Sequence, residues 1–513
     1  MHSDSASSLE LSRRDFLAHT ALAGLGGLTI GRAARAAGTG PDNSITRENA
    51  KLGDLGWQLE RPRVVPPFRS PAIEGYCSHP SAKAGEKVEV FVSTHPAAEF
   101  TVDLYRLGYY GGAGARKVRS YGPLTASTQP DPVTGPKRVR DCRWAPSLTI
   151  AIEADWLSGV YLAKLSAVGD DGAQSHVVFI VRDERPADLI FQCSDFTWQA
   201  YNRWPDRFSL YDDGTSGWYW GGGVQVSFNR PYGLYCQDFV DGREALGAGE
   251  FLLWEFPFAY WLEQHGFDVT YISNLDTHRD PAGLDRAAGF LSVGHDEYWT
   301  IEMFRNVQAA VARGLSVGFF SGNAVCGRIV LGPDAAGRPD RAFERVGVFG
   351  PPGGTHEFDS MSTIRHERPY ANELIGAHST GPVTGGADWV CRKPDHWVFA
   401  GTGMKEGDGI PGLVGWEWHG DPAPIPGLEV LASAATFSEP GKPNGGEFTA
   451  TLYPGPQGNL VFNASTIWWA DGLSAPPGYR RPAVYTKPQG PDPRVQRITR
   501  NILERMIAAR KGA

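Results

Sequence analysis

The sequence predicts an α/β protein in which a doubly wound parallel sheet with β-rich insertions follows a β-sandwich of immunoglobulin type. Two changes of pattern along the 513 residues predict this fold. Short stretches of alternating apolar and polar residues, separated by turn residues, run between positions 85 and 183, as in half-buried antiparallel strands. After residue 187, short apolar runs alternate with helical segments, which is typical of a parallel sheet covered by helices.

The first forty residues predict a signal for export. An arginine pair, Arg13-Arg14, precedes a moderately apolar stretch at 18–30 that is rich in Ala and Gly, and Ala-Arg-Ala at 34–36 offers a cleavage site. This order is that of a secretory signal, and the arginine pair marks the twin-arginine route, which moves folded proteins. We therefore expect residues 1–37 to be a twin-arginine signal peptide, recognised by the twin-arginine export machinery, and the mature protein to be periplasmic or secreted. The alternative is a disordered basic tail.

Composition limits the other partners. No stretch approaches the roughly 18 consecutive apolar residues of a membrane helix, so we expect no stable membrane span. The formal net charge of -8 argues against a nucleic-acid partner. The 63 Gly and 38 Pro indicate many turns and long loops rather than disorder, because 41% of the residues are hydrophobic.

Two segments are expected between the signal peptide and the α/β domain. Residues 38–84 contain several prolines and predict an irregular lead-in. The β-sandwich domain follows at 85–183 and ends in a polar hinge. Its strands are expected at 88–92, 102–106, 147–152, 159–167 and 175–181.

The α/β domain is predicted to span residues 187–511. The apolar run Leu189-Ile190-Phe191 leaves no room for alternation, as in a buried parallel strand. Residues 350–470, rich in Gly, Trp and short β runs, predict inserted or edge strands. The remaining elements are a helix at 250–265 ending at Gly266, strands at 268–272, 290–293 and 315–320, a helix at 300–313 before Gly314, and a final helix at 494–510.

Six cysteines are present, and none forms a Cys-x-x-Cys pair, so their spacing is not that of a zinc site. Cys77 and Cys142 are the pair expected to form a disulfide if one exists. Folding before export would nevertheless take place in a reducing compartment.

Polar segments follow three of the predicted strands, at 194–201, 294–299 and 321–324. In an open α/β sheet, ligands bind beyond the carboxyl ends of the strands. The sharpest segment is Gly294-His295-Asp296-Glu297-Tyr298-Trp299, where a tight turn would expose ionisable side chains near a helix N-terminus. The alternative is that Asp296 only caps the following helix and that His295 is an ordinary core histidine.

Several long motifs resemble those of the N,N-dimethylformamidase large (beta) subunit family, C-terminal domain, and together they cover about residues 75–510. Those motifs are Leu-Ser-Val-Gly-His-Asp-Glu-Tyr-Trp at 291–299, Ser-Gly-Asn-Ala at 321–324, Trp-Gln-Ala-Tyr-Asn at 198–202, Ser-Phe-Asn-Arg-Pro-Tyr at 227–232, His-Trp-Val-Phe-Ala-Gly-Thr-Gly at 396–403, Val-Phe-Asn-Ala-Ser-Thr at 461–466 and, in the sandwich, Tyr-Arg-Leu-Gly-Tyr-Tyr-Gly-Gly at 105–112.

The resemblance implies one mononuclear Fe(III) site held by two tyrosinates and one glutamate. The glutamate falls on Glu297, and the tyrosines fall on Tyr201 and Tyr232, with three further tyrosines nearby in sequence. His295 and Asn323 match residues that line the pocket beside the metal. The nearby tyrosines are Tyr211, Tyr219 and Tyr235.

The resemblance also implies a glutamine-amidotransferase-like core and a hydrolase that cleaves an amide C–N bond in a small molecule. Phenolate and carboxylate oxygens are hard ligands that suit Fe(III). His295 would protonate the leaving amine, and His295 or Asn323 would donate to the developing oxyanion.

Other interpretations stay open. The export signal and the length of the chain depart from the well-known amidase, so neither the substrate nor a small subunit can be inferred. A metal-free polysaccharide hydrolase would use Glu297 and Asp296 as acid and base. A non-catalytic carbohydrate-binding envelope protein would use the sandwich and some of the 16 Trp. Glu417 is a candidate second carboxylate of the pocket, although a packing role is also open.

Overall fold

The computed structural model describes most of the chain after residue 41. The chain divides into Met1–Gly40 and one compact unit, Pro41–Ala513, and only the second unit is described below. The expected signal peptide at 1–37 lies outside the described residues. These are 42–65, 68–169, 172–215, 217–219, 221–234, 245–346, 370–379, 386–415, 417–439, 441–480 and 490–511.

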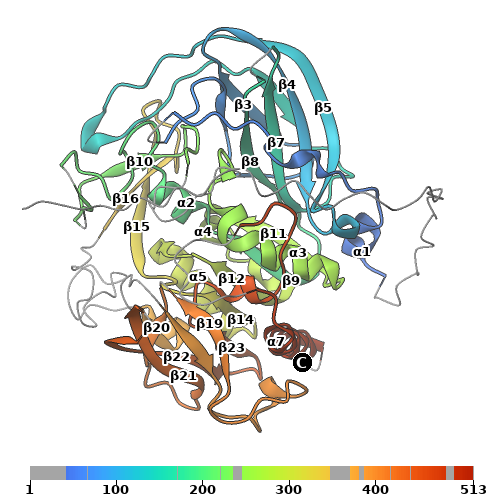
Figure 1. Ribbon diagram of the computed structural model, residues 1–513, viewed down its shortest axis with the longest axis vertical. Helices are drawn as coiled ribbons and strands as arrows, with labels where there is room; N and C mark the ends of the chain where they lie inside the picture. The colour runs from blue at the N-terminus through green and yellow to red at the C-terminus, as the bar shows by residue number, and fades with distance from the viewer. Residues whose placement is uncertain are drawn as a thin grey trace, which may run out of the picture. The chain divides into compact units, whose positions relative to one another are not determined.

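Two sheets pack face to face in the N-terminal part (Figure 1). The alternation expected around residues 88–92 places Val88, Val90 and Val92 in the core, where each is fully buried. One sheet has the order β1-β3-β6 and the other β2-β8-β7-β4-β5. Their strands are β1 (Glu74–Cys77), β2 (Ser81–Ala82), β3 (Lys87–Ser93), β4 (Ala98–Leu107), β5 (Ala115–Ala126), β6 (Leu148–Ala151), β7 (Gly159–Ala167) and β8 (Gln174–Val181).

The lead-in expected to be irregular contributes regular structure. It contains the helix α1 (Ser44–Asn49) and the strands β1 and β2. Strand β1 pairs with β3 and sets Tyr76 opposite Phe91, with their rings stacked 4.6 Å apart. Four residues among prolines are too short a run for alternation to be visible, so the sequence pattern did not identify this strand.

The second part is a mixed α/β structure built on a nine-stranded sheet, ordered β11-β9-β12-β14-β23-β22-β21-β18-β19. The pairs from β11 to β23 are parallel, and the pairs from β23 to β19 are antiparallel. The apolar runs of the sequence form the parallel half, and the Gly- and Trp-rich region forms most of the antiparallel half. The strands are β9 (Ala187–Cys193), β11 (Val269–Ser273), β12 (Ala287–Gly294), β14 (Ser316–Ser321), β18 (Gly386–Val390), β19 (Gly409–Gly415), β21 (Glu429–Glu439), β22 (Lys442–Pro454) and β23 (Leu460–Asn463).

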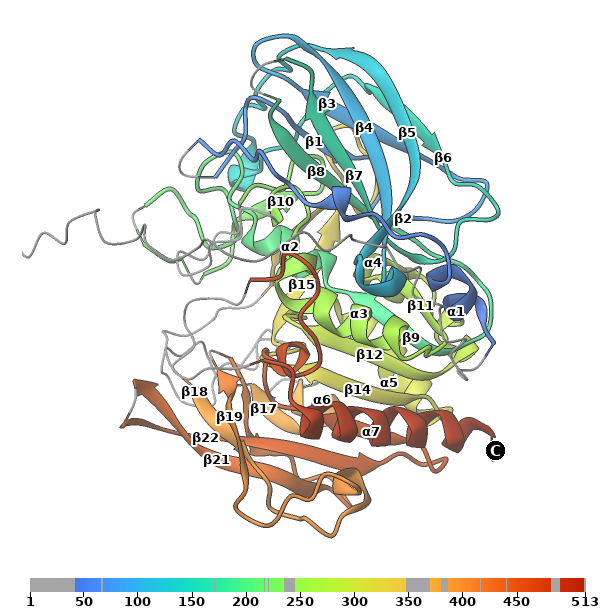
Figure 2. The ribbon, with the colours of Figure 1, turned by 45° about the vertical axis from the view of Figure 1, so that its right-hand side comes forward.

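Helices pack against the parallel half of this sheet (Figure 2). Helix α7 (Pro493–Lys511) runs along β12 and β14, and its Met506 lies 3.2 Å from where a Cβ of Gly289 or Gly318 would stand. Those glycines therefore let the helix approach the sheet closely. The other helical elements are α2 (Asp195–Tyr201), the π-helix η5 (Phe251–Glu255), α3 (Phe256–Gln264), α4 (Asn274–Arg279), α5 (Ile301–Ala312) and the short α6 (Asn372–Ile375).

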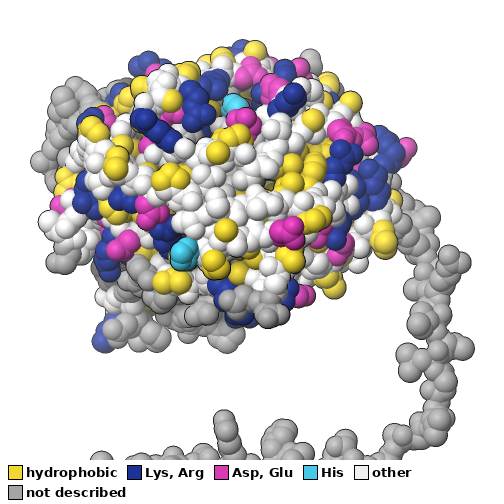
Figure 3. Space-filling view, turned by 90° about the horizontal axis from the view of Figure 1, so that it is seen from above, with side chains coloured by type: hydrophobic (Ala, Val, Ile, Leu, Met, Phe, Trp, Pro, Cys, Tyr) yellow, Lys and Arg dark blue, Asp and Glu magenta, His cyan; other side chains and the backbone are white. Residues whose placement is uncertain are grey.

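Three shorter features complete the description. A four-stranded sheet has the order β10-β16-β15-β13, and β17 pairs with β20. No helix in the described part of the chain is long and apolar enough to cross a membrane. The face in Figure 3 carries acidic and basic side chains interspersed with apolar ones. The short strands are β10 (Gln225–Ser227), β13 (Tyr298–Trp299), β15 (Gly327–Gly332), β16 (Ala342–Arg345), β17 (Ala377–Ser379) and β20 (His419–Pro422).

A buried ion pair joins the sandwich to helix α3. The Arg106 guanidinium on β4 donates to the Glu263 carboxylate at 2.8 Å, and both side chains are fully buried. Tyr271 and Asn49 also donate to Glu263, so the charges are hydrogen-bonded on several sides. A pair satisfied in this way fixes how the two parts meet, because losing either partner would strand a buried charge.

The expected Cys77–Cys142 disulfide is wrong. Five cysteines lie among the described residues, and all of them are free thiols. The Cys77 thiol donates to the backbone carbonyls of His79 and Val178, while Cys142 is buried in a separate cluster beside Trp144. Proximity in sequence and a shared domain did not bring the two sulfurs together. Cys236 lies outside the described residues.

Candidate functional site

Three neighbouring strands deliver polar segments to the same edge of the sheet (Figure 1). Strand β9 runs into α2, β12 into the turn that begins at Gly294, and β14 into the turn at 321–325. Since parallel strands end at one edge, these segments meet there, as the sequence analysis predicted.

The turn after β12 depends on Gly294. Its φ is 69°, and a Cβ at this position would lie 2.6 Å from the Cβ of Trp254. Only glycine meets both demands. The backbone amides of Glu297 and Tyr298 donate to the Thr197 hydroxyl at 3.0 and 3.1 Å, which ties the turn to α2.

Asp296 has a structural role and does not cap the next helix. Its carboxylate accepts hydrogen bonds from Gln192 at 2.7 Å, Ser292 at 2.8 Å and Asn274 at 3.1 Å. The cap of α5 is Thr300, whose side chain accepts from the backbone amide of Met303. The capping alternative for Asp296 is therefore wrong. The Asp296 carboxylate instead connects the turn to β9 and α4 through hydrogen bonds.

Three tyrosine hydroxyls form a buried cluster with the Glu297 carboxylate. The Tyr201 hydroxyl donates to Glu297 Oε2 at 2.6 Å. The Tyr211 hydroxyl lies 2.8 Å from that of Tyr201 and 3.2 Å from Glu297 Oε1. The Tyr298 hydroxyl donates to Tyr211 at 2.7 Å. Burial, followed by the charge of Glu297, raises the pKa of Tyr201 and of Tyr211 well above the usual value.

Tyr232 is not in this cluster, contrary to the expectation that it would stand with Tyr201 and Glu297. Its ring packs edge-on against Trp198 at 6.3 Å, and it lines a small separate cavity that also contains Cys77 and Asp195. Tyr211, one of the neighbouring tyrosines considered from sequence, stands at Glu297 instead. The hydroxyl of Tyr219 donates to a backbone carbonyl, and Tyr235 lies outside the described residues.

A local turn and a cation hold Tyr211 in place. The Asp212 carboxylate accepts from the backbone amide of Ser209 at 3.0 Å, and the Ser209 hydroxyl accepts from the amide of Tyr211 at 3.1 Å. The Arg345 guanidinium stands 4.7 Å from the centre of the Tyr211 ring. Hydrogen bonding to local backbone is why the Ser-x-x-Asp segment turns here and points the phenol inward.

His295 is surrounded by carboxylates, unlike an ordinary core histidine. Its Nε2 lies 2.9 Å from Glu417 and 3.3 Å from Glu297, and its Nδ1 lies 3.3 Å from Glu250. Burial alone would lower the pKa of His295, but these carboxylates raise it well above its usual value. Burial raises the pKa of Glu417 and of Glu250 to about 7. The arrangement therefore holds protons within reach of Glu297 at neutral pH.

Sequence patterns did not identify Glu250. It precedes the π-helix η5, and its carboxylate accepts from the Trp254 indole at 3.0 Å while facing His295. Single-turn π-helices are frequent at functional sites. No sequence pattern predicts a π-turn, so the position of Glu250 could be identified only from the structure.

Asn323 lies in a strained turn after β14. Its φ is 53°, it is 3% exposed, and its side-chain oxygen has no hydrogen-bond partner among the described residues. A buried amide left with spare hydrogen-bonding capacity is uncommon and marks a place where a ligand can bind. Gly322 beside it meets the backbone carbonyl of Glu417, since a Cβ there would lie 2.2 Å from that oxygen.

The oxygen cluster is held by hydrogen bonds, and the same spacing is compatible with ligands of one metal ion. With metal–oxygen bonds of about 2.0 Å, adjacent ligand oxygens of one ion lie roughly 2.8–3.3 Å apart. The oxygens of Tyr201, Tyr211 and Glu297 lie 2.6 to 3.4 Å from one another. No group of three His, Cys, Asp or Glu side chains that could hold a metal occurs among the described residues. Any ligand set at this position would therefore have to include the phenols.

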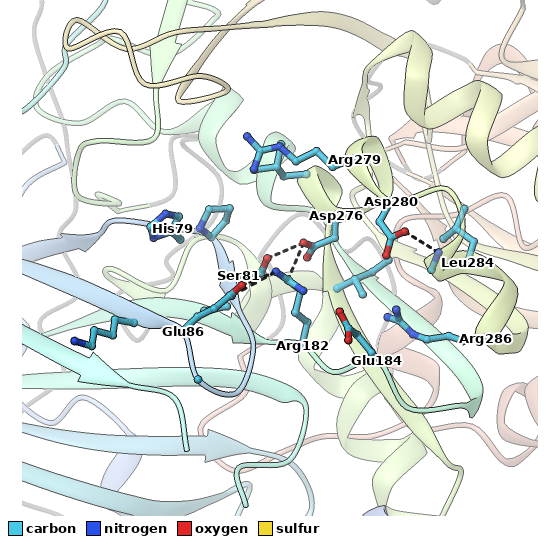
Figure 4. A pocket seen from close by; sticks show the side chains of 17 residues that line it. His79, Ser81, Glu86, Arg182, Glu184, Asp276, Arg279, Asp280, Leu284 and Arg286 are labelled. Carbon is cyan, nitrogen blue, oxygen red and sulfur yellow. Dashed lines mark hydrogen bonds and ion pairs between the residues drawn. The ribbon is translucent and has the colours of Figure 1, made fainter. Parts of the chain in front are cut away.

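A larger hollow lies elsewhere, between the sandwich and helix α4 (Figure 4). Its volume is about 630 Å³. Asp276 accepts from Ser81 and pairs with Arg182, which also reaches Glu86. These charges compensate one another, and no residue of the Glu297 cluster lines the hollow.

Comparison with known protein families identifies the family of this chain. Residues 101–482, well over half of the chain, match the model of the N,N-dimethylformamidase beta subunit-like, C-terminal family. The chain belongs to this family. The matched range includes every residue of the Glu297 cluster, His295 and its carboxylates, and Asn323. No curated protein matches the chain. Membership of a dimethylformamidase-like family indicates a hydrolase of the amide type.

Proposed function

We propose that this protein hydrolyses an amide C–N bond with the help of one Fe(III) ion bound by Tyr201, Tyr211 and Glu297. The mutual spacing of their oxygens, 2.6 to 3.4 Å, carries the proposal. Tyr211 replaces Tyr232 in the ligand set. Two phenols and one carboxylate are hard donors of the kind that Fe(III) prefers. Because burial raises the pKa of both phenols, only a strongly Lewis-acidic cation would displace their protons at neutral pH.

When bound, ferric iron would supply a Lewis acid and lower the pKa of a water molecule toward neutrality. The protein's own groups would do the rest. His295 would hand a proton from its Nε2 to the leaving amine, and Glu417, 2.9 Å from that nitrogen, would share and replace the proton. Glu250 at Nδ1 would hold the ring in orientation.

Asn323 would bind the substrate oxygen. Asn323 is buried, and the donor to a carbonyl would be its Nδ2 group, while its Oδ1, an acceptor, has no partner among the described residues. A fixed donor aimed at a carbonyl that gains negative charge lowers the barrier, because no solvent must reorganise during the reaction. The surrounding core of aromatic and aliphatic side chains would keep bulk water out.

The metal-free polysaccharide hydrolase is disfavoured by the position of Asp296. Its carboxylate is fully buried and accepts three hydrogen bonds on the side of Gln192 and Asn274. A general acid or base must reach the substrate. No feature of the described sandwich residues specifically favours the carbohydrate-binding alternative.

We further infer a core of glutamine-amidotransferase-like topology after an immunoglobulin-like sandwich, and export of the folded, metal-loaded protein by the twin-arginine route. The parallel order of β11, β9, β12, β14 and β23 supports the first inference. The arginine pair at Arg13-Arg14 supports the second. The family description names a beta subunit, which implies a second kind of subunit. We therefore include a small partner subunit in this proposal.

Elemental analysis and the visible spectrum of the purified protein test the proposed function. We expect one iron per chain and a broad visible absorption band from phenolate-to-iron charge transfer, together with release of an amine from N,N-dimethylformamide or another small amide. A protein that hydrolyses such amides after complete removal of iron, or one that contains no iron and shows no such band, would contradict the proposal.

A further inference from the structure

We propose that His419 is a positioning residue, which holds the turn at 321–325 and thereby fixes the position of Asn323. This inference rests on the proposed function for its catalytic consequence. Its structural content, however, stands on contacts that involve neither a metal ion nor a substrate.

The turn is strained and needs external support. Asn323 has a φ of 53° and Val325 a φ of 59°. The left-handed region is unusual for any residue with a Cβ and is a genuine outlier for a β-branched one. Such conformations persist only where the surroundings impose them.

One side of the turn is attached to the segment that carries Glu297. The amide of Val325 donates to the Asp296 carbonyl at 3.0 Å, and that of Gly327 donates to the Glu297 carbonyl at 2.8 Å. The Ser321 hydroxyl donates to the Gly294 carbonyl at 2.7 Å. None of these three bonds involves Ala324, in the middle of the turn.

His419 provides that support. Its Nε2 accepts a hydrogen bond from the Ala324 amide at 3.0 Å, and its Nδ1 lies 2.7 Å from the Asn463 side-chain oxygen. Since a backbone N–H can only donate, Nε2 is the unprotonated nitrogen and Nδ1 carries the proton. The imidazole is therefore neutral, and burial, which lowers its pKa to about 4, keeps it neutral.

The histidine is itself fixed by the end of strand β23. The Asn463 oxygen also accepts from the amide of Ser465 at 2.9 Å. The Ser465 hydroxyl accepts from the His419 amide at 3.0 Å and donates to its carbonyl at 2.6 Å. Both the ring and the backbone of His419 are therefore fixed, so its Nε2 stays at one position relative to the Ala324 amide. His419, Asn463 and Ser465 are all fully buried.

Three variants and one control test this role. His419→Leu removes the acceptor, His419→Asn keeps a donor for Asn463 but is too short to reach Ala324, and His419→Gln restores an acceptor near the position of Nε2. His176→Leu is the matched control. His176 is also fully buried, lies on strand β8 of the sandwich and contacts the backbone carbonyl of Trp57 through its Nε2, away from the turn.

Two readouts are measured on folded holoprotein: amide hydrogen exchange of a peptide covering residues 321–327, and kcat and KM for N,N-dimethylformamide at constant iron content. We expect exchange to quicken at least roughly tenfold and kcat to fall roughly tenfold to a hundredfold in His419→Leu and His419→Asn, with KM and iron little changed. His419→Gln should recover most of both, and His176→Leu should alter neither.

Unchanged exchange in whichever of His419→Leu and His419→Asn folds would overturn the positioning role. So would an equal effect of His176→Leu. Quickened exchange in a protein that neither binds iron nor cleaves amides would uphold the structural role of His419 while sinking the proposed function, so the two failures can be told apart.

Discussion

The Tyr211 hydroxyl lies 2.8 Å from the Tyr201 hydroxyl, and both lie within hydrogen-bonding distance of the Glu297 carboxylate. Two phenols that approach one carboxylate this closely share a single small volume. Their protonation and hydrogen bonding are therefore coupled, and replacing one phenol should alter the hydrogen bonds of the other phenol and of Glu297.

Replacing Tyr211 with phenylalanine should abolish most of the visible iron band, because it removes one of the two proposed phenolate ligands. Tyr232→Phe is the matched control, since that ring lies against Trp198 in a separate cavity and should leave the band unchanged. Absorption spectra and iron content of both variants decide the matter. Loss of iron in Tyr232→Phe together with its retention in Tyr211→Phe would restore the ligand set expected from sequence.

Glu250→Gln should lower kcat without releasing iron. The Glu250 carboxylate faces His295 Nδ1 at 3.3 Å and does not belong to the Glu297 oxygen cluster. Losing the group that orients a catalytic histidine should cost on the order of tenfold to a hundredfold in rate. Steady-state kinetics with parallel iron analysis measure it. A variant that loses its iron but keeps its activity per bound iron would show that Glu250 serves the metal site instead.

Gly294→Ala should destabilise the protein by roughly 2–4 kcal/mol, since the new methyl group would overlap Trp254 and the backbone φ is left-handed. Gly337→Ala is a control for backbone strain alone, because Gly337 has a φ of 81° and no atom lies within 4 Å of where its Cβ would stand. Urea denaturation of both variants compares them. Equal losses would mean that the approach of Trp254 does not restrict this position.

Breaking the Arg106–Glu263 pair from one side should cost about 3–5 kcal/mol, because the remaining charge would be buried without its partner. Arg106→Met and Glu263→Gln test the two sides. The double variant should be more stable than the sum of the single losses suggests, and a double-mutant cycle in chemical denaturation measures the difference. Strict additivity would indicate that the two side chains do not interact in solution.

The contribution of two buried histidines to stability should fall as the pH drops from about 6.5 to about 4, against the opposite contribution of Glu250 and Glu417, whose pKa burial raises to about 7. Burial lowers the pKa of both His176 and His419 to about 4, so the folded state holds them neutral while the unfolded state protonates them. Each contribution is present in full above the unfolded pKa of about 6.5 and is lost progressively as the pH falls toward 4. A shift of this size corresponds to roughly 3 kcal/mol per histidine.

Denaturation midpoints of the wild-type protein and of His176→Leu between pH 4 and 7 isolate the contribution of His176, because all other titrating groups are common to both. The wild-type protein should lose stability relative to the variant as the pH falls, and a stability difference that does not change with pH would contradict the neutral assignment of His176.

The sequence patterns predicted four of the five strands in the parallel half of the large sheet, all but β23, and the meeting of its three polar turns. Leu189-Ile190-Phe191 and its counterparts are continuous apolar runs, and burial on both faces of a parallel sheet produces that pattern directly. Strand β1 was not predicted because four residues among prolines are too few to show an alternation of apolar and polar side chains. The choice between Tyr211 and Tyr232 could not be made from sequence either. Both lie in turns, and only the folded chain decides which phenol reaches Glu297.

Glu250 and His419 were not predicted for a related reason. Their roles depend on partners 45 and 95 positions away, His295 and Ala324 respectively. Local periodicity and capping rules describe contacts within a few residues, so they carry no information on such pairs. The family resemblance supplied Tyr201, Glu297, His295 and Asn323 for the proposed site, but it gave no indication of Glu250 or His419.

Strand β23 has a consequence for biogenesis. It pairs with β14 on one side and β22 on the other, and its last residue, Asn463, orients His419. A nascent polypeptide that ends just after the turn at 321–325 already carries Glu297 and Asn323 but lacks the strand that supports them. Because β23 is synthesised so much later, the pocket is completed late, and the proposed iron would be bound only after that point. Shortened products of translation that end before β23 should be inactive even when their sandwich has already folded.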